Sequence, residues 1–164
     1  MKLLVLAIGG TIDKVYFDAL SDYQIGAPAV TEILQRVKAN FDFEVRQMIS
    51  KDSLVMTDAD RQEILSEVQD HSGKHVIITH GTDTMVETGQ VLKQAAHKII
   101  VIMGAMQPAI MKLTDADFNL GVAVAAVQTL SEGVYLCMNG RIYNVDRVVK
   151  NRAEGQFQDL GEGL

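Results

Sequence analysis

The first residues of the chain contain the feature that most restricts its fold. Residues 3–8, Leu-Leu-Val-Leu-Ala-Ile, form an unbroken apolar run, and Gly9 and Gly10 follow it directly. A strand with one face in water alternates apolar and polar residues, whereas an unbroken run is typical of a strand covered on both faces, as in a parallel sheet. The run therefore predicts a buried first strand, and the two glycines predict a tight turn at its end.

Similar apolar runs recur along the chain and alternate with segments of helical period. Further strands are predicted at residues 43–49, 75–79, 99–103 and 134–138, with a short sixth strand at 141–145. Helices are predicted to begin at Pro28 and after Thr57, and to cover residues 83–97 and 115–130. No element is predicted for the polar stretch 13–27. This order predicts an α/β fold, a doubly wound and mainly parallel sheet with helices on both faces.

Length and composition restrict the class of protein further. The chain has 164 residues, of which 48% are hydrophobic, enough for one globular domain with a buried core. No apolar run reaches the length of about 18 residues that a membrane-spanning helix needs. The net charge of −6 argues against nucleic acid as a partner.

The single cysteine, Cys137, is expected to be a buried and unreactive thiol. Because no export signal is recognised, we expect a cytoplasmic protein.

Polar residues gather at the ends of three predicted strands. The first strand is followed by Gly9-Gly10-Thr11-Ile12, the third by residues 80–85, and the fourth by residues 104–108. In a doubly wound sheet, ligands bind at the carboxyl ends of the strands, near the point where the strand order reverses. None of the three segments has the glycine spacing of a dinucleotide-binding or phosphate-binding loop. We therefore expect the functional site at this edge of the sheet.

The second segment is the richest in reactive side chains. Residues 82–84, Thr-Asp-Thr, are predicted to lie in the first turn of a helix, where exposed backbone N–H groups stabilise negative charge. A threonine hydroxyl becomes a nucleophile only when a base removes its proton. The candidate bases are Lys150, Tyr16 and Tyr23. The simpler alternative is that this segment only caps the helix.

The histidines are expected to have structural roles. His80 precedes a glycine turn and is expected to be packed and hydrogen-bonded rather than catalytic. His71 and His75 are four residues apart, but Ser72 and Gly73 interrupt any helix between them, and no third ligand is nearby. We therefore expect no metal site.

These segments resemble the N-terminal domain of the bacterial-type L-asparaginases. The resemblance rests on four motifs in the family's order: residues 8–12, Ile-Gly-Gly-Thr-Ile; residues 78–85, Ile-Thr-His-Gly-Thr-Asp-Thr-Met; residues 104–108, Gly-Ala-Met-Gln-Pro; and residues 117–120, Asp-Phe-Asn-Leu. It extends over almost the whole chain. It implies a catalytic domain at residues 1–157, followed by a C-terminal tail at residues 158–164.

The resemblance implies an amidohydrolase that converts L-asparagine to L-aspartate and ammonia through a threonine acyl-enzyme, without a metal or organic cofactor. Thr11 matches the attacking residue of the family, and Tyr23 matches the tyrosine that helps to activate it. The resemblance also implies a second cluster, in which Lys150 polarises the hydroxyl of Thr82 beside Asp83. The residues that it places on the substrate are Gly10, Ser50, Gly81, Thr82 and Asp83, with Asp83 on the α-ammonium group and Ser50 on the α-carboxylate.

Two other functions stay open from the sequence. The second domain of the family does not follow the motifs, so the alternative is a non-catalytic amino-acid-binding or regulatory module derived from the same domain. A further alternative is an amidohydrolase with an N-terminal threonine, which requires cleavage before Thr11 or Thr82. For the catalytic function, an uncovered strand edge leaves the site open to water. We therefore expect a homo-oligomer in which a neighbouring subunit closes the site.

Overall fold

The chain folds around a six-stranded sheet with five parallel strands and one antiparallel strand at its edge. The computed structural model describes residues 1–18 and 22–161. The order across the sheet is β4-β1-β5-β6-β7-β8, and only β8 runs antiparallel to its neighbour. The bounds are Lys2–Ala7 for β1, Asp42–Gln47 for β4, His75–Thr79 for β5, Ile99–Met103 for β6, Gly133–Met138 for β7 and Arg141–Asn144 for β8.

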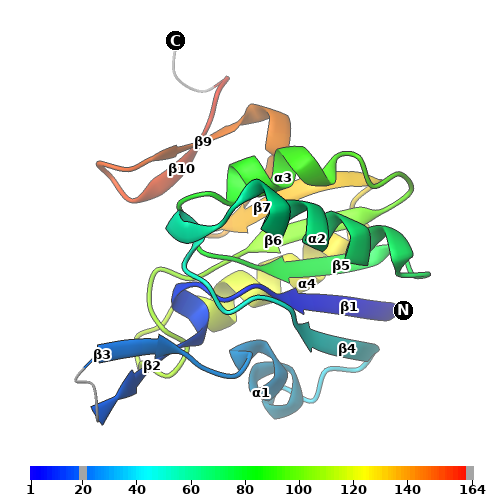
Figure 1. Cartoon of the computed structure of the whole chain (residues 1–164). Helices are drawn as coiled ribbons and strands as arrows, with labels where there is room; N and C mark the ends of the chain where they lie inside the picture. The colour runs from blue at the N-terminus through cyan, green and yellow to red at the C-terminus, as the bar shows by residue number, and fades with distance from the viewer. Residues whose placement is uncertain (19–21, 162–164) are drawn as a thin grey trace.

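Helices cover both faces of this sheet. α2 (Asp58–Asp70) and α3 (Met85–Leu92) pack on one face, and α1 (Ala29–Arg36) and α4 (Ala116–Thr129) pack on the other, as Figure 1 shows. A mainly parallel sheet between two helical layers is the arrangement predicted from the alternation of strands and helices. The predicted fold class is therefore confirmed.

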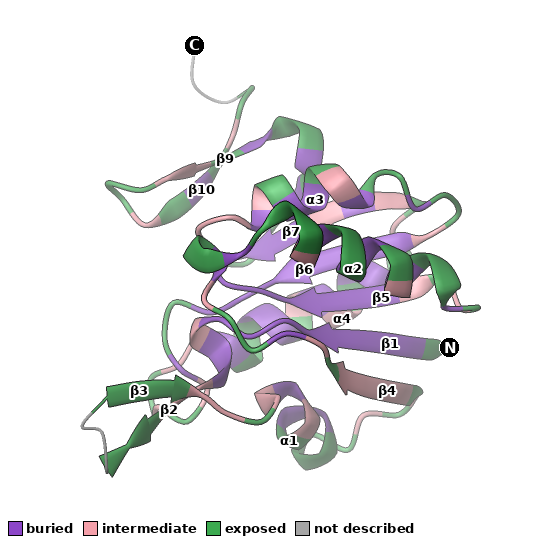
Figure 2. Ribbon diagram, in the orientation of Figure 1, coloured by how far each residue is buried: buried purple, intermediate pink, exposed green. Residues whose placement is uncertain are grey.

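The first strand shows why a strand that is buried on both faces needs an unbroken apolar run. Leu4 and Leu6 join the apolar cluster that contains α2 and α3, whereas Leu3 and Val5 join the cluster that contains α1 and α4. All four side chains are fully buried, and Figure 2 shows β1, β5 and β6 buried between the helices. Because successive side chains of a strand point to opposite faces, a polar residue at any of these positions would be desolvated.

Helices α2 and α4 agree with their predicted ranges. Thr57 and Asp60 form a capping box, in which the Thr57 hydroxyl accepts a hydrogen bond from Asp60 N (3.2 Å) and the Asp60 carboxylate accepts one from Thr57 N (2.8 Å). In α4, the small side chains of Ala123 and Ala126 are buried, which lets this helix lie close to β6.

Helix α3 is shorter than predicted at both ends. It covers Met85–Leu92 instead of residues 83–97, so residues 82–84 form the turn before the helix and not its first turn. The Thr84 hydroxyl is held outside the helix because it donates to Ser53 O (2.9 Å), a residue 31 positions away. At its C-terminal end, the helix passes into a turn with hydrogen bonds between residues three apart. Sequence periodicity contains no information about such contacts.

Two β-hairpins that the sequence analysis missed project beyond the carboxyl ends of the parallel strands (Figure 1). The first consists of β2 (Lys14–Phe17) and β3 (Asp22–Ile25), in the stretch for which no element was predicted. The second consists of β9 (Val148–Asn151) and β10 (Gln156–Asp159). These strands have four residues each and many exposed side chains, so they carry little periodic signal.

Short elements complete the described chain. The 3₁₀ helices η1, η3 and η4 occupy Thr11–Asp13, Ser53–Val55 and Val145–Arg147. Of the expected tail, residues 158 and 159 belong to β10, and residues 162–164 lie outside the described residues. Within residues 1–18 and 22–161, no helix has the length and apolar character needed to cross a membrane.

Two helical glycines, one in α3 and one in α4, differ in how much space surrounds them. A Cβ at Gly89 in α3 would lie 2.5 Å from Val145 Cγ2, whereas a Cβ at Gly121 in α4 would meet nothing within 4 Å. Alanine favours a helix over glycine by about 1 kcal/mol, but overpacking a core costs about 1–3 kcal/mol. We expect Gly89→Ala to lower the free energy of unfolding by about 1 kcal/mol, and Gly121→Ala to raise it by a similar amount. Urea denaturation measures both, and equal stabilisation by the two substitutions would contradict the packing.

Candidate active site

The strand order reverses at the centre of the sheet, between β1 and β5. From β1 the chain crosses to β4 on one side, and it continues from β5 through β6 to β7 on the other side. The loops after β1 and β5 therefore diverge from a common crevice, which is where doubly wound sheets bind ligands. These loops contain residues 9–12 and residues 80–84, two of the segments singled out in the sequence.

The loops after β1 and β5 touch through their backbones. A Cβ at Gly10 would lie 2.5 Å from Gly81 N, and a Cβ at Gly81 would lie 2.6 Å from Ser53 Oγ. Gly10 also has a φ of 88°, which side chains disfavour. Glycine is therefore required at both positions. Thr11 and Thr82, the residues that follow, are consequently placed on loops in direct contact.

A largely buried lysine reaches this edge from the second hairpin. Lys150 Nζ donates hydrogen bonds to Thr82 Oγ1 (2.8 Å) and to Asp83 Oδ1 (2.7 Å), and only 11% of its side chain is exposed. Its partner in β10 is Phe157, which is buried and packs against Tyr143. The structure thus brings together three predicted site residues from segments 67 positions apart.

These contacts bear on the alternative that residues 82–84 only cap α3. Thr84 is the N-cap residue, and it makes no side-chain capping hydrogen bond. Thr82 and Asp83 bind Lys150 instead. An ammonium group shared between a hydroxyl and a carboxylate forms charge-assisted hydrogen bonds, which are stronger than neutral ones. Capping therefore does not account for this cluster.

Thr11 and Tyr23 lie on different elements. Thr11 begins η1 and is half-buried, and η1 is tied to the loop after β6 because Ala109 N donates to Ile12 O (3.0 Å). Tyr23 lies on β3 with 45% of its surface exposed, and its ring packs edge-to-face on Tyr16, with 5.7 Å between the centroids. Within the described residues, no hydrogen bond joins Tyr23 to Thr11.

Two serines in the loop after β4 differ in their surroundings. Ser50, the predicted ligand of the α-carboxylate, is exposed, and its hydroxyl accepts a hydrogen bond from Gln47 Nε2 (2.7 Å). Ser53 is 1% exposed, and in the part of the chain that the structure describes its Oγ has no hydrogen-bond partner. A buried hydroxyl without a partner is unfavourable unless a ligand or water satisfies it. Ser53, which adjoins Gly81, is therefore a candidate that sequence reasoning missed, although a second serine three residues after Ser50 was a visible signal.

His80 and Cys137 are buried and chemically inert. His80 Nδ1 lies 2.7 Å from Gly81 O and Nε2 lies 2.8 Å from Thr88 Oγ1, and burial lowers the pKa of this histidine to about 4. Burial raises the pKa of the Cys137 thiol to about 12. Both residues therefore have the packing roles that the sequence predicted. Among residues 1–18 and 22–161, no group of three or more His, Cys, Asp or Glu side chains is placed to hold a metal ion.

Comparison with known proteins identifies the family. A sequence model described as "Asparaginase, N-terminal" matches residues 2–158. The chain belongs to the asparaginase family. It is 32% identical over 155 residues to the probable L-asparaginase 4 of Schizosaccharomyces pombe and 30% identical over 160 residues to L-asparaginase 2 of Escherichia coli. Its structure resembles that of the thermostable L-asparaginase from Thermococcus kodakarensis with a TM-score of 0.82 at 28% identity.

The chain spans about half the length of these asparaginases. The matches include 86%, 91% and 97% of this chain, but only 44%, 46% and 51% of the S. pombe, E. coli and T. kodakarensis proteins, respectively. The similarity to asparaginases therefore applies to one domain, and the function of that domain has to be argued from its own residues.

His80 makes the stability of this asparaginase domain depend on pH. Its pKa is about 4 in the folded protein and 6.5 ordinarily, so between these values the unfolded chain binds a proton that the folded chain does not. The stabilisation is complete above pH 6.5 and is lost as the pH falls towards 4. As the pH falls from 6.5 to 4, we expect the free energy of unfolding of the wild type to decrease by up to about 3 kcal/mol more than that of His80→Gln. Urea denaturation of both proteins across this range measures the change, and a constant difference would contradict a buried neutral imidazole.

Proposed function

We propose that this chain is the catalytic domain of an asparaginase-type amidohydrolase, which converts L-asparagine to L-aspartate and ammonia through a threonine acyl-enzyme. The observation that carries the proposal is the contact of Lys150 with Thr82 and Asp83, on a loop that touches the loop of Thr11. Holding a lysine in a nearly buried position costs free energy, and such clusters occur preferentially at functional sites. Membership of the asparaginase family supports hydrolysis of an amide.

In the proposed first step, Thr11 Oγ1 attacks the side-chain amide carbon of L-asparagine. The C–N bond breaks, an ester joins the aspartyl group to Thr11, and the hydroxyl proton leaves with the nitrogen as ammonia. In the second step, water attacks the ester, its oxygen enters the aspartate carboxylate, one of its protons returns to Thr11, and the other is released and taken up by the ammonia. Tyr23 is the proposed carrier of the proton at Thr11, and no metal or organic cofactor takes part.

The second cluster contributes charge and orientation. Lys150 donates to Thr82 Oγ1 and so directs the lone pairs and the proton of that hydroxyl towards the crevice. Asp83, with one oxygen on Lys150, has its other oxygen available for the α-ammonium group of the substrate. Groups fixed before the substrate arrives lose little freedom when it reacts, which favours catalysis.

In the proposed complex, the α-carboxylate of the substrate lies beside the contact between Gly10 and Gly81. We assign the α-carboxylate to the hydroxyl of Ser50 or of the buried Ser53, whose unpartnered Oγ adjoins Gly81. The backbones of Gly10 and Gly81 are the proposed floor of the crevice, and they can approach each other this closely because neither residue has a side chain.

The second candidate is a non-catalytic amino-acid-binding module. The observation that favours it is the exposed position of Tyr23, which has no hydrogen bond to Thr11 within the described residues. Binding of L-asparagine by calorimetry, without release of ammonia between pH 6 and pH 9, identifies this function. Ammonia production by the intact chain, verified by mass, excludes it, and also excludes the alternative of an N-terminal threonine.

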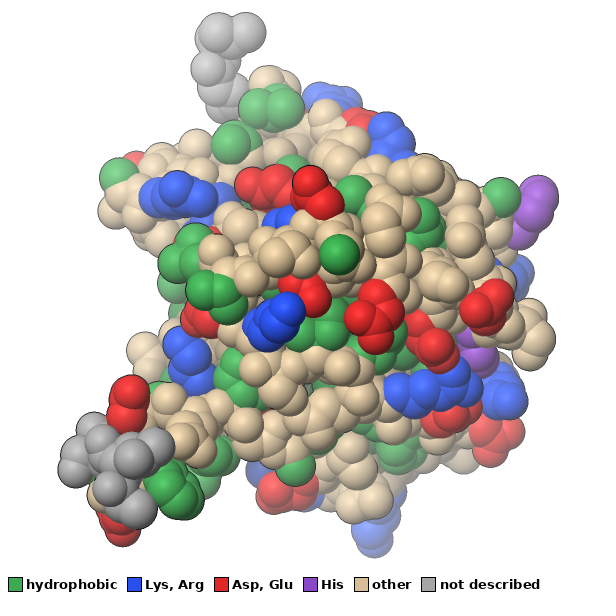
Figure 3. All heavy atoms as spheres, viewed as in Figure 1, with side chains coloured by type: hydrophobic (Ala, Val, Ile, Leu, Met, Phe, Trp, Pro, Cys, Tyr) green, Lys and Arg blue, Asp and Glu red, His purple; other side chains and the backbone are tan. Residues whose placement is uncertain are grey.

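The proposed assembly is a homo-oligomer in which a second copy covers the open edge. Large apolar side chains are exposed on the hairpins and loops of this edge, and Figure 3 shows part of this surface beside the first hairpin. The apolar side chains of this surface are Tyr16, Phe17, Tyr23, Leu54, Val55, Met106, Ile110 and Leu113. Such a concentration of apolar surface is typical of an interaction site.

The reduced thiol of Cys137 fits the cytoplasm, which we propose as the location.

Replacement of the two threonines tests the reaction directly. We expect Thr11→Ala and Thr82→Val each to reduce ammonia release from L-asparagine by about a thousandfold or more, because one removes the nucleophile and the other the hydroxyl on Lys150. Thr129→Ala, at the exposed end of α4, is the matched control and should retain full activity. Circular dichroism verifies the fold of each variant. Wild-type activity in either variant removes that threonine from the mechanism.

Lys150 is tested against a surface lysine of the same kind. We expect Lys150→Met to lower kcat/KM by about a hundredfold, since the methionine fills the space but leaves Thr82 and Asp83 without their cation. Lys93→Met is the control, because Lys93 forms an exposed ion pair with Asp146. Such pairs contribute little to stability. Equal activities of the two variants would show that the contacts of Lys150 are structural only.

A further inference from the structure

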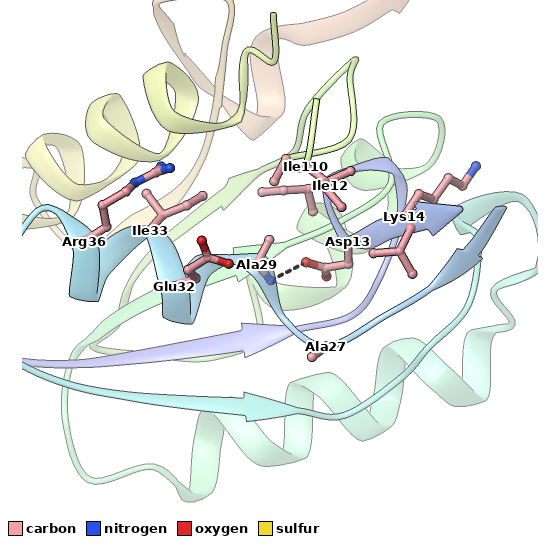
Figure 4. Close-up of a pocket in the computed structure, with 11 residues that line it drawn as sticks. Ile12, Asp13, Lys14, Ala27, Ala29, Glu32, Ile33, Arg36 and Ile110 are labelled. Atoms are coloured by element: carbon pink, nitrogen blue, oxygen red, sulfur yellow. Dashed lines mark hydrogen bonds between the residues drawn. The ribbon is translucent and has the colours of Figure 1, made fainter. Parts of the chain in front are cut away.

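Asp13 closes the neck of the first hairpin. Its backbone oxygen accepts a hydrogen bond from Gly26 N (2.8 Å), on the far side of the hairpin, and its backbone N–H donates to Gly10 O (3.2 Å). Its side chain is buried, and Oδ1 accepts a hydrogen bond from Ala29 N (2.9 Å) at the start of α1. Asp13 thus connects the turn that contains Thr11, both ends of the hairpin and the first helix, as Figure 4 shows for the contact with Ala29.

The contact with α1 has a clear physical reason. Pro28 is the N-cap residue of α1, and proline has no side-chain oxygen with which to accept a hydrogen bond from the first turn. The Asp13 carboxylate supplies that acceptor from another part of the chain, and its negative charge is favourable at the N-terminus of a helix. The cap of α1 therefore depends on the side chain of the residue whose backbone closes the hairpin.

We propose that Asp13 is a positioning residue, which closes the neck of the β2–β3 hairpin against α1 and thereby fixes the place of Tyr23 relative to Thr11. This inference rests on the proposed function, in which Tyr23 carries the proton at Thr11. Asp13 lies two positions after Thr11 and within the same 3₁₀ turn. Loss of its carboxylate detaches the base of the hairpin from α1, and the displacement grows towards the outer part of the hairpin, where Tyr23 lies.

The charge of Asp13 makes this closure dependent on pH. Burial raises the pKa of Asp13 to about 6, although the hydrogen bond from Ala29 N opposes the shift. The pKa of this carboxyl is higher in the closed position than its ordinary value of 3.8, so protonation favours the closed position, and closure strengthens as the pH falls through 6. The charged residues around the same cavity of about 390 Å³ are Lys14 from β2 and Glu32 and Arg36 from α1, while the loop after β6 contributes only Ala109 and Ile110 (Figure 4).

The two cations beside Asp13 are engaged elsewhere. Lys14 pairs with Asp52 (3.2 Å), and Arg36 pairs with Asp117 (2.6 Å). The Asp13 carboxylate is therefore held chiefly by the backbone N–H of Ala29. Substitution by asparagine keeps an acceptor for this N–H and removes the charge, whereas substitution by alanine removes both.

Hydrogen exchange and kinetics of Asp13→Ala and Asp13→Asn test the proposal in the full chain. Asp18→Asn is the matched control, because Asp18 follows β2 and is exposed. In Asp13→Ala we expect the amides of residues 22–27 to exchange about tenfold faster than in the wild type, by mass spectrometry at pH 7. We expect kcat for L-asparagine to fall about tenfold with little change in KM, since Tyr23 acts in the reaction step and not in binding.

The asparagine variant separates the charge from the hydrogen bond. Because the buried charge opposes closure, we expect Asp13→Asn to raise kcat by up to about threefold at pH 7, and to match the wild type at pH 5, where Asp13 is itself largely neutral. A kcat ratio that stays constant between these pH values would contradict a role of the carboxylate charge. This readout remains informative if Asp13→Ala does not fold.

The outcomes distinguish this inference from the proposed function. Unchanged exchange in both Asp13 variants overturns the closure, whatever their activity. Faster exchange with unchanged kcat shows that the hairpin does not position a reacting group, and it also overturns the proposal. Absence of ammonia release by the wild type contradicts the proposed function instead, and the exchange rates then decide alone whether Asp13 closes the hairpin.

Discussion

The direct backbone contact between the loops after β1 and β5 is the constraint on which the rest of the site depends. A methyl group at Gly10 would overlap the amide of Gly81, so neither loop has room for a side chain at this point. The contact follows from the sheet, because β1 and β5 are adjacent parallel strands whose carboxyl ends share one edge. Strand order and two glycines are thus enough to hold the hydroxyl groups of Thr11 and Thr82 on touching loops.

The charged cluster depends on a second constraint, which is apolar. Lys150 reaches Thr82 and Asp83 because the β9–β10 hairpin is anchored by Phe157, which is buried and whose carbonyl accepts a hydrogen bond from the Tyr143 hydroxyl (2.8 Å). Removing an ammonium group from water is unfavourable unless an opposite charge and hydrogen bonds compensate for it. Asp83 provides both, so the ion pair and the apolar anchor support the same hairpin position.

The sequence predicted those parts of the fold that burial on both faces determines. The run at residues 3–8 has one interpretation, because five of its six side chains enter one of two apolar clusters and the sixth, Ala7, is also buried. The hairpins were missed, since their strands are short and partly exposed. The start of α3 was wrong because a hydrogen bond from Thr84 to Ser53 fixes it. Ser50 and Ser53 cannot be distinguished from composition, because only the packed loop shows which hydroxyl is buried. Tertiary contacts thus account for the errors at α3 and at the two serines.

The two halves of the candidate site lie on hairpins that are fixed to the core by different kinds of contact. The hairpin of Lys150 is fixed to the core by a buried aromatic side chain, so the cluster with Thr82 and Asp83 exists before a substrate binds. The hairpin of Tyr23 is fixed at its neck by polar contacts of Asp13, while its tyrosine rings are about half exposed. Because catalysis depends on groups already held in the geometry of the transition state, the proposed reaction depends on how firmly the polar contacts of Asp13 hold this hairpin.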